Sequence, residues 1–216
     1  MLLGIDTCGS TGTIALARRD GERITVLGMA ELAGKTYSAM LVPRLRELLE
    51  THGVGLREIE AIVVVNGPGS FTGVRVGVSA VKGLAEIFAT PVIAVSRLRV
   101  LAQKAETRFA ALDAGRGEFY LRDDDPLGSY EALLSLPEVQ STVSVGELGV
   151  CEEKVATALQ GAQVVDPPTA SEALIVAQPR IVAGDFDDLA SLDGNYLRRS
   201  DAEVKHQAGA LAGKAQ

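Results

Sequence analysis

The chain has 216 residues, 47% of them hydrophobic and 23% charged, so it holds enough apolar side chains for one large domain or two small lobes. Its 21 lysines and arginines are outnumbered by 28 aspartates and glutamates, which gives a net charge of −7 at pH 7. This balance excludes a strongly basic protein that grips nucleic acid unaided, because such proteins neutralise phosphates with basic surfaces. Any contact with RNA would need a basic partner.

The two cysteines, Cys8 and Cys151, stand far apart and outside any CxxC spacing, so the sequence predicts neither a disulfide framework nor a zinc site. No window reaches the roughly 20 apolar residues that a membrane-spanning helix needs, and the first residues lack the basic region of a secretion signal. We therefore expect a soluble, cytoplasmic protein that does not bind membranes.

The first half of the chain predicts strands followed by alternating helices and strands. Three short apolar runs separated by glycine-containing turns predict a three-stranded meander, and the helical spacing of apolar residues that begins at Tyr37 predicts a helix. The uniformly apolar stretch 61–65 is typical of a strand buried on both faces. We expect Ser96 to cap a further helix. The expected strands are 2–5, 13–17, 24–29, 61–65 and 91–95, and the expected helices are 37–49, 70–88 and 97–104.

The second half opens in the same way as the first. A strand leads to Asp113, a glycine turn follows, and a second strand returns, just as the first strand of the chain leads to Asp6 and a returning strand. The two aspartates lie about half a chain apart, which indicates a duplicated αβ unit. Beyond Asp123 the pattern is too weak to place elements closely. We predict two related lobes, residues 1–104 and a smaller one of residues 105–216.

Two loops hold candidate contacts for a phosphate or nucleotide. Asp6 ends a buried strand, where a phosphate-handling hairpin carries a carboxylate that orders a metal-bound water. Alternatively, Asp6 only starts an Asx-turn, and Asp113 belongs to an ordinary hairpin turn. The second loop, 66–75, leads into a helix whose first N–H groups favour anions, but its spacing is neither a P-loop nor a dinucleotide fingerprint. The candidate contacts are Asp6, Thr7, Ser10, Gly67, Gly69 and Ser70.

The helix expected at 70–88 is apolar nearly all round, so it must be covered on more than one side. Four mostly small residues recur at helical spacing and form a stripe that another helix could approach closely. One interpretation is burial within this chain. The other is a protein interface shared with the preceding helix, in which Arg75 reaches a carboxylate or phosphate of a partner. The stripe is Gly73, Gly77, Ala80 and Leu84, and the other candidate interface residues are Tyr37, Met40, Leu41 and Arg75.

Residues for catalysis by the chain itself are sparse. The histidines, His52 and His206, form neither a metal-binding pair nor part of a triad. Cys8 lies near a turn and is either a nucleophile or a small buried filler, with no histidine evident to activate it. Arg198 and Arg199 are either a phosphate contact or a solvated pair. We predict no catalytic residue, no metal site and no cofactor of its own.

Five segments carry motifs that point to one family: residues 3–7, 36–43, 67–77, 112–118 and 196–198. Together they resemble the TsaB (YeaZ) family of tRNA threonylcarbamoyladenosine biosynthesis proteins, most specifically in the glycine run that ends with Arg75. The resemblance covers essentially the whole chain and is strongest through about residue 121. The sequence departs from the family pattern at Cys8, where serine is expected, at Tyr37, where histidine is frequent, and at Gly194-Asn195, which replace a proline-containing segment.

The resemblance implies the α/β, actin-like ATPase fold of sugar kinases and Hsp70 proteins (ASKHA), with two related lobes and the second abbreviated. It implies a non-catalytic partner of the TsaD transferase, which modifies tRNAs that read ANN codons, working together with the ATPase TsaE. TsaB proteins lack the metal-binding histidines of TsaD and pair with it through helices of the first lobe. We accordingly expect TsaD and TsaE as partners, a homodimer in isolation, tRNA contact only through the complex, and ATP or ADP at the complex interface.

Three other functions fit parts of the sequence. A stand-alone actin-like ATPase or small-molecule kinase would hold Mg-nucleotide between the lobes, and ATP turnover by the isolated chain would favour it. A glycoprotease-like peptidase would need zinc ligands or an activated nucleophile, and metal analysis would identify it. A self-contained homodimer would pack the stripe of small residues against its own copy.

Overall fold

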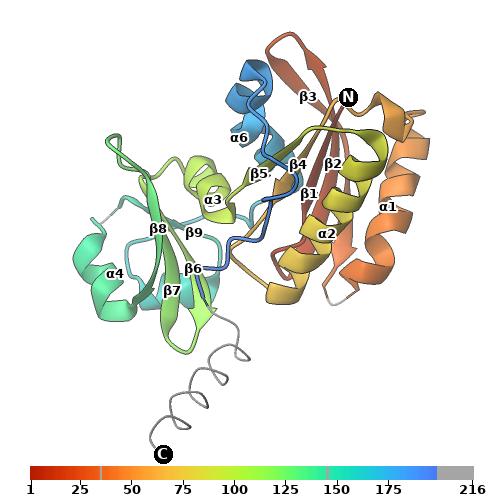
Figure 1. Ribbon diagram of the computed structural model, residues 1–216. Coiled ribbons are helices and arrows are strands. Elements are labelled where there is room, and N and C mark those ends of the chain that lie inside the picture. The colour runs from red at the N-terminus through yellow and green to blue at the C-terminus, as the bar shows by residue number, and fades with distance from the viewer. Residues whose placement is uncertain (35, 145, 199–216) are drawn as a thin grey trace, which may run out of the picture.

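The computed structural model describes residues 1–34, 36–144 and 146–198, which form two five-stranded sheets with helices around them (Figure 1). The first half contains β1 (Leu2–Asp6), β2 (Thr11–Asp20), β3 (Arg23–Ala33), α1 (Tyr37–Thr51), the short 3-10 helix η1 (Leu56–Glu58), β4 (Ala61–Val65), α2 (Phe71–Phe88), β5 (Val92–Val95) and α3 (Arg97–Ala105). The second half contains β6 (Phe109–Gly115), β7 (Glu118–Asp123), β8 (Tyr130–Ser135), α4 (Leu136–Thr142), β9 (Leu148–Val150), α5 (Glu153–Ala158), β10 (Gln163–Val164) and α6 (Ala170–Ala183).

The two halves repeat one topology. Apart from η1, each runs strand, strand, strand, helix, strand, helix, strand, helix, and the sheet orders β3-β2-β1-β4-β5 and β8-β7-β6-β9-β10 correspond strand for strand. In both sheets the first three strands pair antiparallel and the last two extend the first strand in parallel. Asp6 and Asp113 therefore lie on equivalent strands. The predicted α/β fold of two related lobes, the second with shorter elements, is confirmed.

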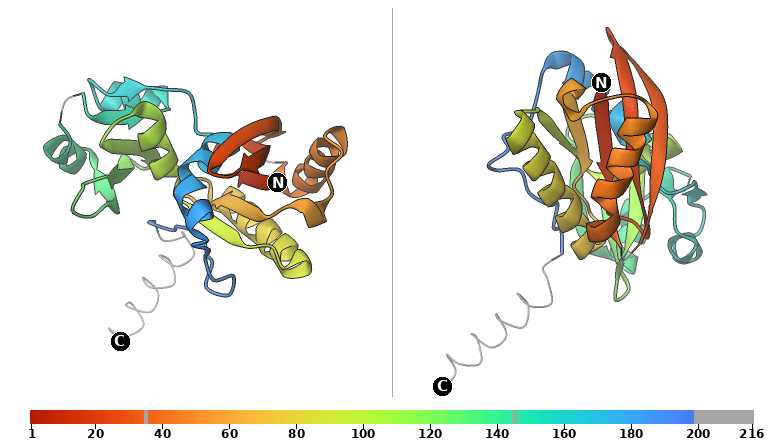
Figure 2. Two further views of the ribbon diagram at one scale, coloured as in Figure 1. Left: turned by 90° about the horizontal axis from the view of Figure 1, so that it is seen from above. Right: turned by 90° about the vertical axis from the view of Figure 1, so that its right-hand side faces the viewer.

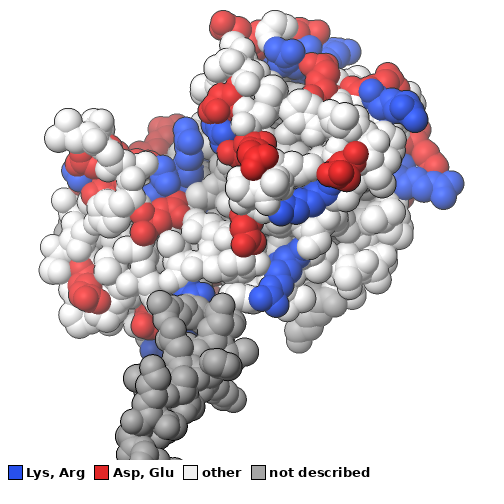
Figure 3. Space-filling view, in the orientation of Figure 1, with Lys and Arg blue, Asp and Glu red and all other residues white. Residues whose placement is uncertain are grey.

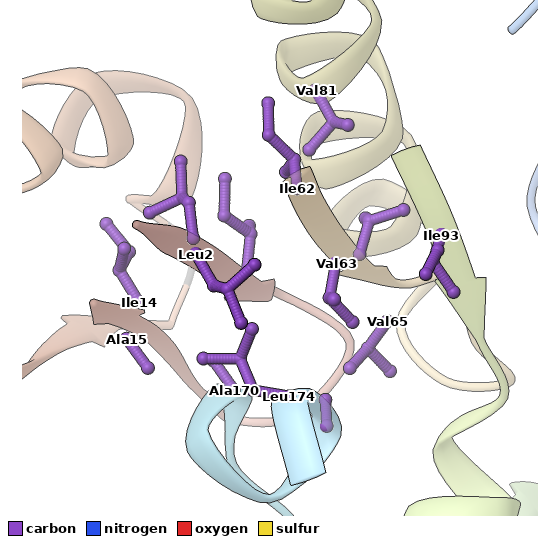
Figure 4. Close-up of a cluster of buried hydrophobic side chains, with 14 of the residues drawn as sticks. Leu2, Ile14, Ala15, Ile62, Val63, Val65, Val81, Ile93, Ala170 and Leu174 are labelled. Carbon is purple, nitrogen blue, oxygen red and sulfur yellow. The ribbon is translucent and has the colours of Figure 1, made fainter. Parts of the chain in front are cut away.

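The first sheet is the middle layer of a three-layer lobe. Strands β1 and β4 are buried along their whole length, because helices cover both faces of the sheet. Helices α1 and α2 lie on one face and α6 lies on the other (Figures 1 and 2). In Figure 4 Val81 of α2 approaches Ile62 of β4 from one side, while Leu174 of α6 packs from the opposite side. This packing explains the uniformly apolar strand sequences.

The last helix of each half packs on the sheet of the other half. Helix α3 contacts β6, β7 and β9, and its Leu98 and Leu101 are buried in a cluster with Leu112 of β6. Helix α6 lies on the first sheet, and a side chain at Gly4 would collide with the backbone of Ala170. The predicted boundary between residues 104 and 105 does not follow this packing. Helix α3 covers the second sheet and α6 covers the first, because each sheet needs a helix on both faces.

The segment after α6 returns to the junction of the two lobes. The N–H of Asn195 donates to the carbonyl of Asn66 at 2.7 Å, and its side-chain amide donates to Glu131 of β8 at 2.6 Å. The ring of Tyr196 packs on Phe71 at the start of α2, with centroids 4.5 Å apart. Residues 193–198 thus tie the first turn of α2 to the second lobe.

Within the described residues, no helix is both long enough and apolar enough to cross a bilayer.

Candidate functional site

A cavity of about 760 Å³ lies between the two lobes, where the carboxyl ends of the parallel strands β1, β4 and β5 meet. Open α/β sheets commonly bind ligands at this edge, because the loops that leave the strands are free to shape a site there. The first lobe contributes the β1–β2 loop, the start of α1 and the glycine turn with the start of α2, and Arg97 lines the cavity from the start of α3. The second lobe contributes Leu112, Asp113 and Glu152.

Three of the six predicted phosphate contacts reach this cavity: Ser10, Gly69 and Ser70 line its wall. Ser70, where the helix was predicted to begin, is the N-cap of α2, and its hydroxyl oxygen accepts a hydrogen bond from the N–H of Gly73 at 3.2 Å. A side chain at Gly69 would collide with the carbonyl of Cys8, so glycine lets the two loops pack together. The β1–β2 loop and the start of α2 are held as one wall.

The other three predicted contacts, Asp6, Thr7 and Gly67, do not line the cavity. Asp6 is buried, and its Oδ1 accepts the N–H of Cys8 at 2.8 Å, which is the Asx-turn alternative. Thr7 is buried too, and its hydroxyl donates to the carbonyl of Gly73 at 2.7 Å. The carbonyl of Gly67 accepts the N–H of Arg97 at 2.6 Å. These groups brace the loops around the cavity rather than facing it.

Arg97, the first residue of α3 and the basic residue that lines the cavity, was not predicted as a site residue. Arg97 is only 5% exposed, and its Nε lies 3.9 Å from Oδ2 of Asp6, too far for a hydrogen bond. Burial raises the pKa of Asp6, and the guanidinium of Arg97 offsets part of that effect. A cation in the first turn of a helix opposes the helix dipole, and this unfavourable placement was the available sequence signal.

Cys8 has the properties of a buried filler. Its thiol is 1% exposed and donates to the carbonyl of Val65 at 3.1 Å, and burial raises its pKa well above the usual range. A nucleophilic cysteine requires the thiolate, which this environment disfavours. His52 ends α1 and does not line the cavity. His206 and Arg199 lie outside the described residues, so the predictions made for them have no structural counterpart.

Asp113 stands at the opposite wall of the cavity. Its Oδ2 accepts a hydrogen bond from Lys154 at 2.7 Å, and its Oδ1 accepts the N–H of Gly115 at 3.0 Å. Partial burial favours a higher pKa, but these hydrogen bonds outweigh it and hold the pKa of Asp113 below its ordinary value. The N–H of Asp113 donates to Glu152 at 2.8 Å. Among the residues that the structure describes, no group of three histidine, cysteine or acidic side chains is arranged to hold a metal ion.

Four of the eight predicted interface residues are buried within this chain. Gly73 and Gly77 are buried inside this chain, because α2 lies so close to the β1–β2 loop that a side chain at either position would collide with Thr7. Tyr37 and Leu41 are core residues as well, and the Tyr37 hydroxyl donates to the carbonyl of Gly9 at 2.7 Å. Gly73 and Gly77 thus allow close packing within the chain, which was the first of the two interpretations of the stripe.

The remaining predicted interface residues are at or near the surface: Met40, Arg75, Ala80 and Leu84. Ala80 and Leu84 continue along α2 with two residues that the sequence analysis did not single out, Val76 and Ile87, the last being 75% exposed. Their spacing of four, four and three residues puts them on one side of the helix. We call Val76, Ala80, Leu84 and Ile87 the α2 ridge. Arg75 lies beside it, with its guanidinium 4.5 Å from the centroid of the Phe71 ring.

Comparisons of the sequence with known proteins point to proteins of threonylcarbamoyladenosine formation. The family model described as TsaD, tRNA N6-adenosine threonylcarbamoyltransferase, matches residues 29–139. The tRNA threonylcarbamoyladenosine biosynthesis proteins TsaB of Haemophilus influenzae and Escherichia coli are each 39% identical over 125 residues, which is 55% of this chain and 51% and 52% of theirs. The aligned part of the chain thus spans about half the length of these relatives.

The structure of YeaZ from Pseudomonas aeruginosa superimposes with a TM-score of 0.74 at 26% identity, over 91% of this chain and 99% of that one. The actin-like fold expected from the sequence is therefore present over nearly the whole chain. Because the family model matches about half of the chain and the fold is that of YeaZ, the chain belongs to the TsaD family and, within it, to the TsaB (YeaZ) type.

Proposed function

We propose that this chain is a non-catalytic subunit for forming threonylcarbamoyladenosine in tRNAs that read ANN codons. Its partner in this proposal is a TsaD-type transferase, and both work with a TsaE-type ATPase. The observation that carries the proposal is the 39% identity with proteins named for this biosynthesis in two bacteria. The match to the TsaD family model supports a partner that is itself related to this chain.

The side chains around the cavity favour a non-catalytic role for this chain. An active ATPase of this fold would turn Asp6 and Thr7 toward Mg-nucleotide. In this chain Asp6 instead accepts a hydrogen bond from Cys8, and Thr7 donates one to Gly73. Burial raises the pKa of the Cys8 thiol and so disfavours the thiolate that a cysteine peptidase needs. ATP or ADP, in this proposal, binds where the complex forms.

The α2 ridge is the surface that we assign to the partner. It places four apolar side chains along one helix, and Val42 of the neighbouring α1 is 63% exposed. Apolar rows of this kind on a helix suit packing against a helix of another protein. In the absence of TsaD, the same ridge supports the homodimer expected for the isolated chain, since a two-fold interface uses one patch twice.

The charge distribution supports indirect contact with tRNA. Acidic and basic side chains are interspersed on the face seen in Figure 3, with wide uncharged areas between them. With the net charge of −7, such a surface offers little to neutralise a phosphate backbone. The partner proteins supply most of the tRNA contacts in this proposal.

A matched pair of variants on α2 tests the partner surface. Ala80→Arg puts a long charged side chain into the ridge, whereas Ser79→Arg adds the same side chain one residue away on the exposed side of the helix. We expect Ala80→Arg to weaken binding to a TsaD-type protein at least about tenfold on a sizing column or by calorimetry, and Ser79→Arg to leave it nearly unchanged. Equal binding by both variants, with circular dichroism unchanged, would remove the ridge from the interface.

A further inference from the structure

The guanidinium of Arg97 is a buried cation whose hydrogen bonds are incomplete. Its Nε is fully buried and has no hydrogen-bond partner among the residues that the structure describes. Asp6 balances part of the charge from 3.9 Å, but its Oδ1 already accepts the N–H of Cys8. A buried donor without a partner costs about 1–3 kcal/mol, and more when the group is charged. Such a group in a native protein calls for an explanation, and a bound ion is one of them.

The arginine sits in the wall of the cavity between the lobes rather than in the apolar core. Gly9, which also lines the cavity, makes room for it, since a Cβ on Gly9 would come within 2.6 Å of Nη2 of Arg97. The glycine thus lets the guanidinium pack against the β1–β2 loop at the wall of the cavity. Arginine is suited to hold planar or tetrahedral oxyanions there, because its N–H groups form a fixed fork.

The start of α2 supplies a second set of donors to the same space. Ser70, Thr72 and Gly73 line the cavity, and Ser70 occupies the N–H groups of Gly73 and Val74. The N–H groups of the first two helical residues have no acceptor within the helix itself, and the dipole of this 18-residue helix favours negative charge at that end. The guanidinium and the helix start thus present donors to one cavity.

We propose that the cavity between the lobes binds a small ligand through a single oxyanion group, a carboxylate or a phosphate, held by Arg97 and the first turn of α2. The site lies wholly within this chain, so it does not depend on the partner proposed above.

The opposite wall sets the class of ligand. Asp113 and Glu152 bring two carboxylates to the cavity from the second lobe, and Lys154 forms an ion pair with Asp113. A ligand with several negative charges would be repelled by this wall, whereas one whose far end is neutral or positively charged would not. The cavity of about 760 Å³ suits a small metabolite bearing one such group.

The unmodified chain provides the first test. Nitrogen-15 NMR spectra are recorded while inorganic phosphate or acetate is added at constant ionic strength, with chloride as the control. We expect saturable shifts of the backbone N–H signals of Thr72 and Gly73 and of the Nε–H signal of Arg97, with either anion or both. Shifts with phosphate alone assign a phosphate ligand, and shifts with acetate alone a carboxylate. The absence of saturable shifts up to tens of millimolar of either anion would overturn the proposal.

A pair of arginine variants on α3 provides the second test. Arg97→Gln and Arg99→Gln remove one positive charge each from the same helical turn, but Arg99 is exposed and does not line the cavity. We expect Arg97→Gln to weaken binding of the anion at least about tenfold and Arg99→Gln to change it less than about twofold. Equal losses in both variants would show a general charge effect and overturn the site. If Arg97→Gln fails to fold, the NMR titration of the unmodified chain decides.

Discussion

Replacing Gly73 by alanine is expected to destabilise the protein, although alanine is the better helix former. In the structure, a Cβ at this position collides with the backbone carbonyl of Thr7, which belongs to the β1–β2 loop and cannot swing away like a flexible side chain. The carbonyl of Gly73 also accepts the Thr7 hydroxyl at 2.7 Å, so a shift of α2 would stretch that hydrogen bond. The collision is therefore between two pieces of backbone that the fold holds together.

The magnitude follows from opposing terms. Forcing an extra methyl into a packed site costs about 1–3 kcal/mol, and weakening the hydrogen bond adds about 1 kcal/mol. Replacing glycine by alanine within a helix returns about 0.5–1 kcal/mol. The net loss in free energy of unfolding for Gly73→Ala is thus about 1–3 kcal/mol.

Gly83 provides the matched control on the same helix. It is exposed, and a Cβ there meets no atom within 4 Å, so Gly83→Ala should stabilise the protein by about 0.5–1 kcal/mol. Urea unfolding followed by far-ultraviolet circular dichroism measures both, because the chain has no tryptophan. A Gly73→Ala variant as stable as Gly83→Ala would refute the close approach of α2 to the β1–β2 loop.

Three further predictions concern other parts of the molecule. Glu131 accepts hydrogen bonds from Arg122 at 2.8 Å and Asn195 at 2.6 Å, so Glu131→Ala should lower the free energy of unfolding by about 2 kcal/mol or more and speed proteolysis after α6; unchanged proteolysis would contradict the tie between lobes. Burial raises the pKa of Cys151 to about 11 and that of Cys8 well above its usual range, so alkylation of the folded protein at pH 8 should be about 100-fold slower than for a free thiol; rapid labelling would contradict this burial. Hydrogen bonds from Ser135 hold the pKa of Glu138 below the usual 4.5. The stabilisation from these bonds is therefore present above pH 4.5 and is lost as the pH falls through the lower pKa of the folded state. Glu138→Gln should reduce the loss of stability on acidification, and an acid titration identical to that of the unmodified chain would contradict this prediction.

Much of the first lobe could be predicted from the sequence, because its elements carry strong local signals. The strand Ala61–Val65 has the predicted bounds, Ser96 caps α3 as expected, and α2 begins within one residue of the predicted start at Ser70. Buried strands read as unbroken apolar runs, and helix starts read as a serine before an apolar repeat. The repeat of Asp6 at Asp113 also predicted the duplication correctly.

The second lobe was harder to predict because its elements are short and half-exposed. Strand β8 has five partly buried residues and one exposed one, and β10 has only two residues, so neither gives a clear alternation. The exchange of α3 and α6 between the sheets could not be predicted either, since an apolar helix face does not say which sheet covers it. The predicted lobe boundary followed chain order for that reason.

The candidate site was predicted only in part, because its decisive group is defined by what surrounds it. The sequence pointed to the loops after β1 and β4, and three of the residues predicted there, Ser10, Gly69 and Ser70, line the cavity. Arg97 follows β5 as the first residue of α3, and only the structure shows that its guanidinium is buried with an unpartnered nitrogen. Conversely, Gly73 and Gly77 looked like a helix-contact stripe, and the helix contact is with their own chain's β1–β2 loop.

The most direct test of the proposed function is mass spectrometry of tRNA nucleosides after a reconstituted reaction, run with and without this chain. The mixture contains a threonylcarbamoyl-adenylate synthase, TsaD-type and TsaE-type proteins, ATP, threonine, bicarbonate and unmodified tRNA. We expect threonylcarbamoyladenosine only when this chain is present, with a strongly reduced yield for Ala80→Arg and a normal yield for Ser79→Arg. Equal product in the absence of the chain would contradict its role as a required partner.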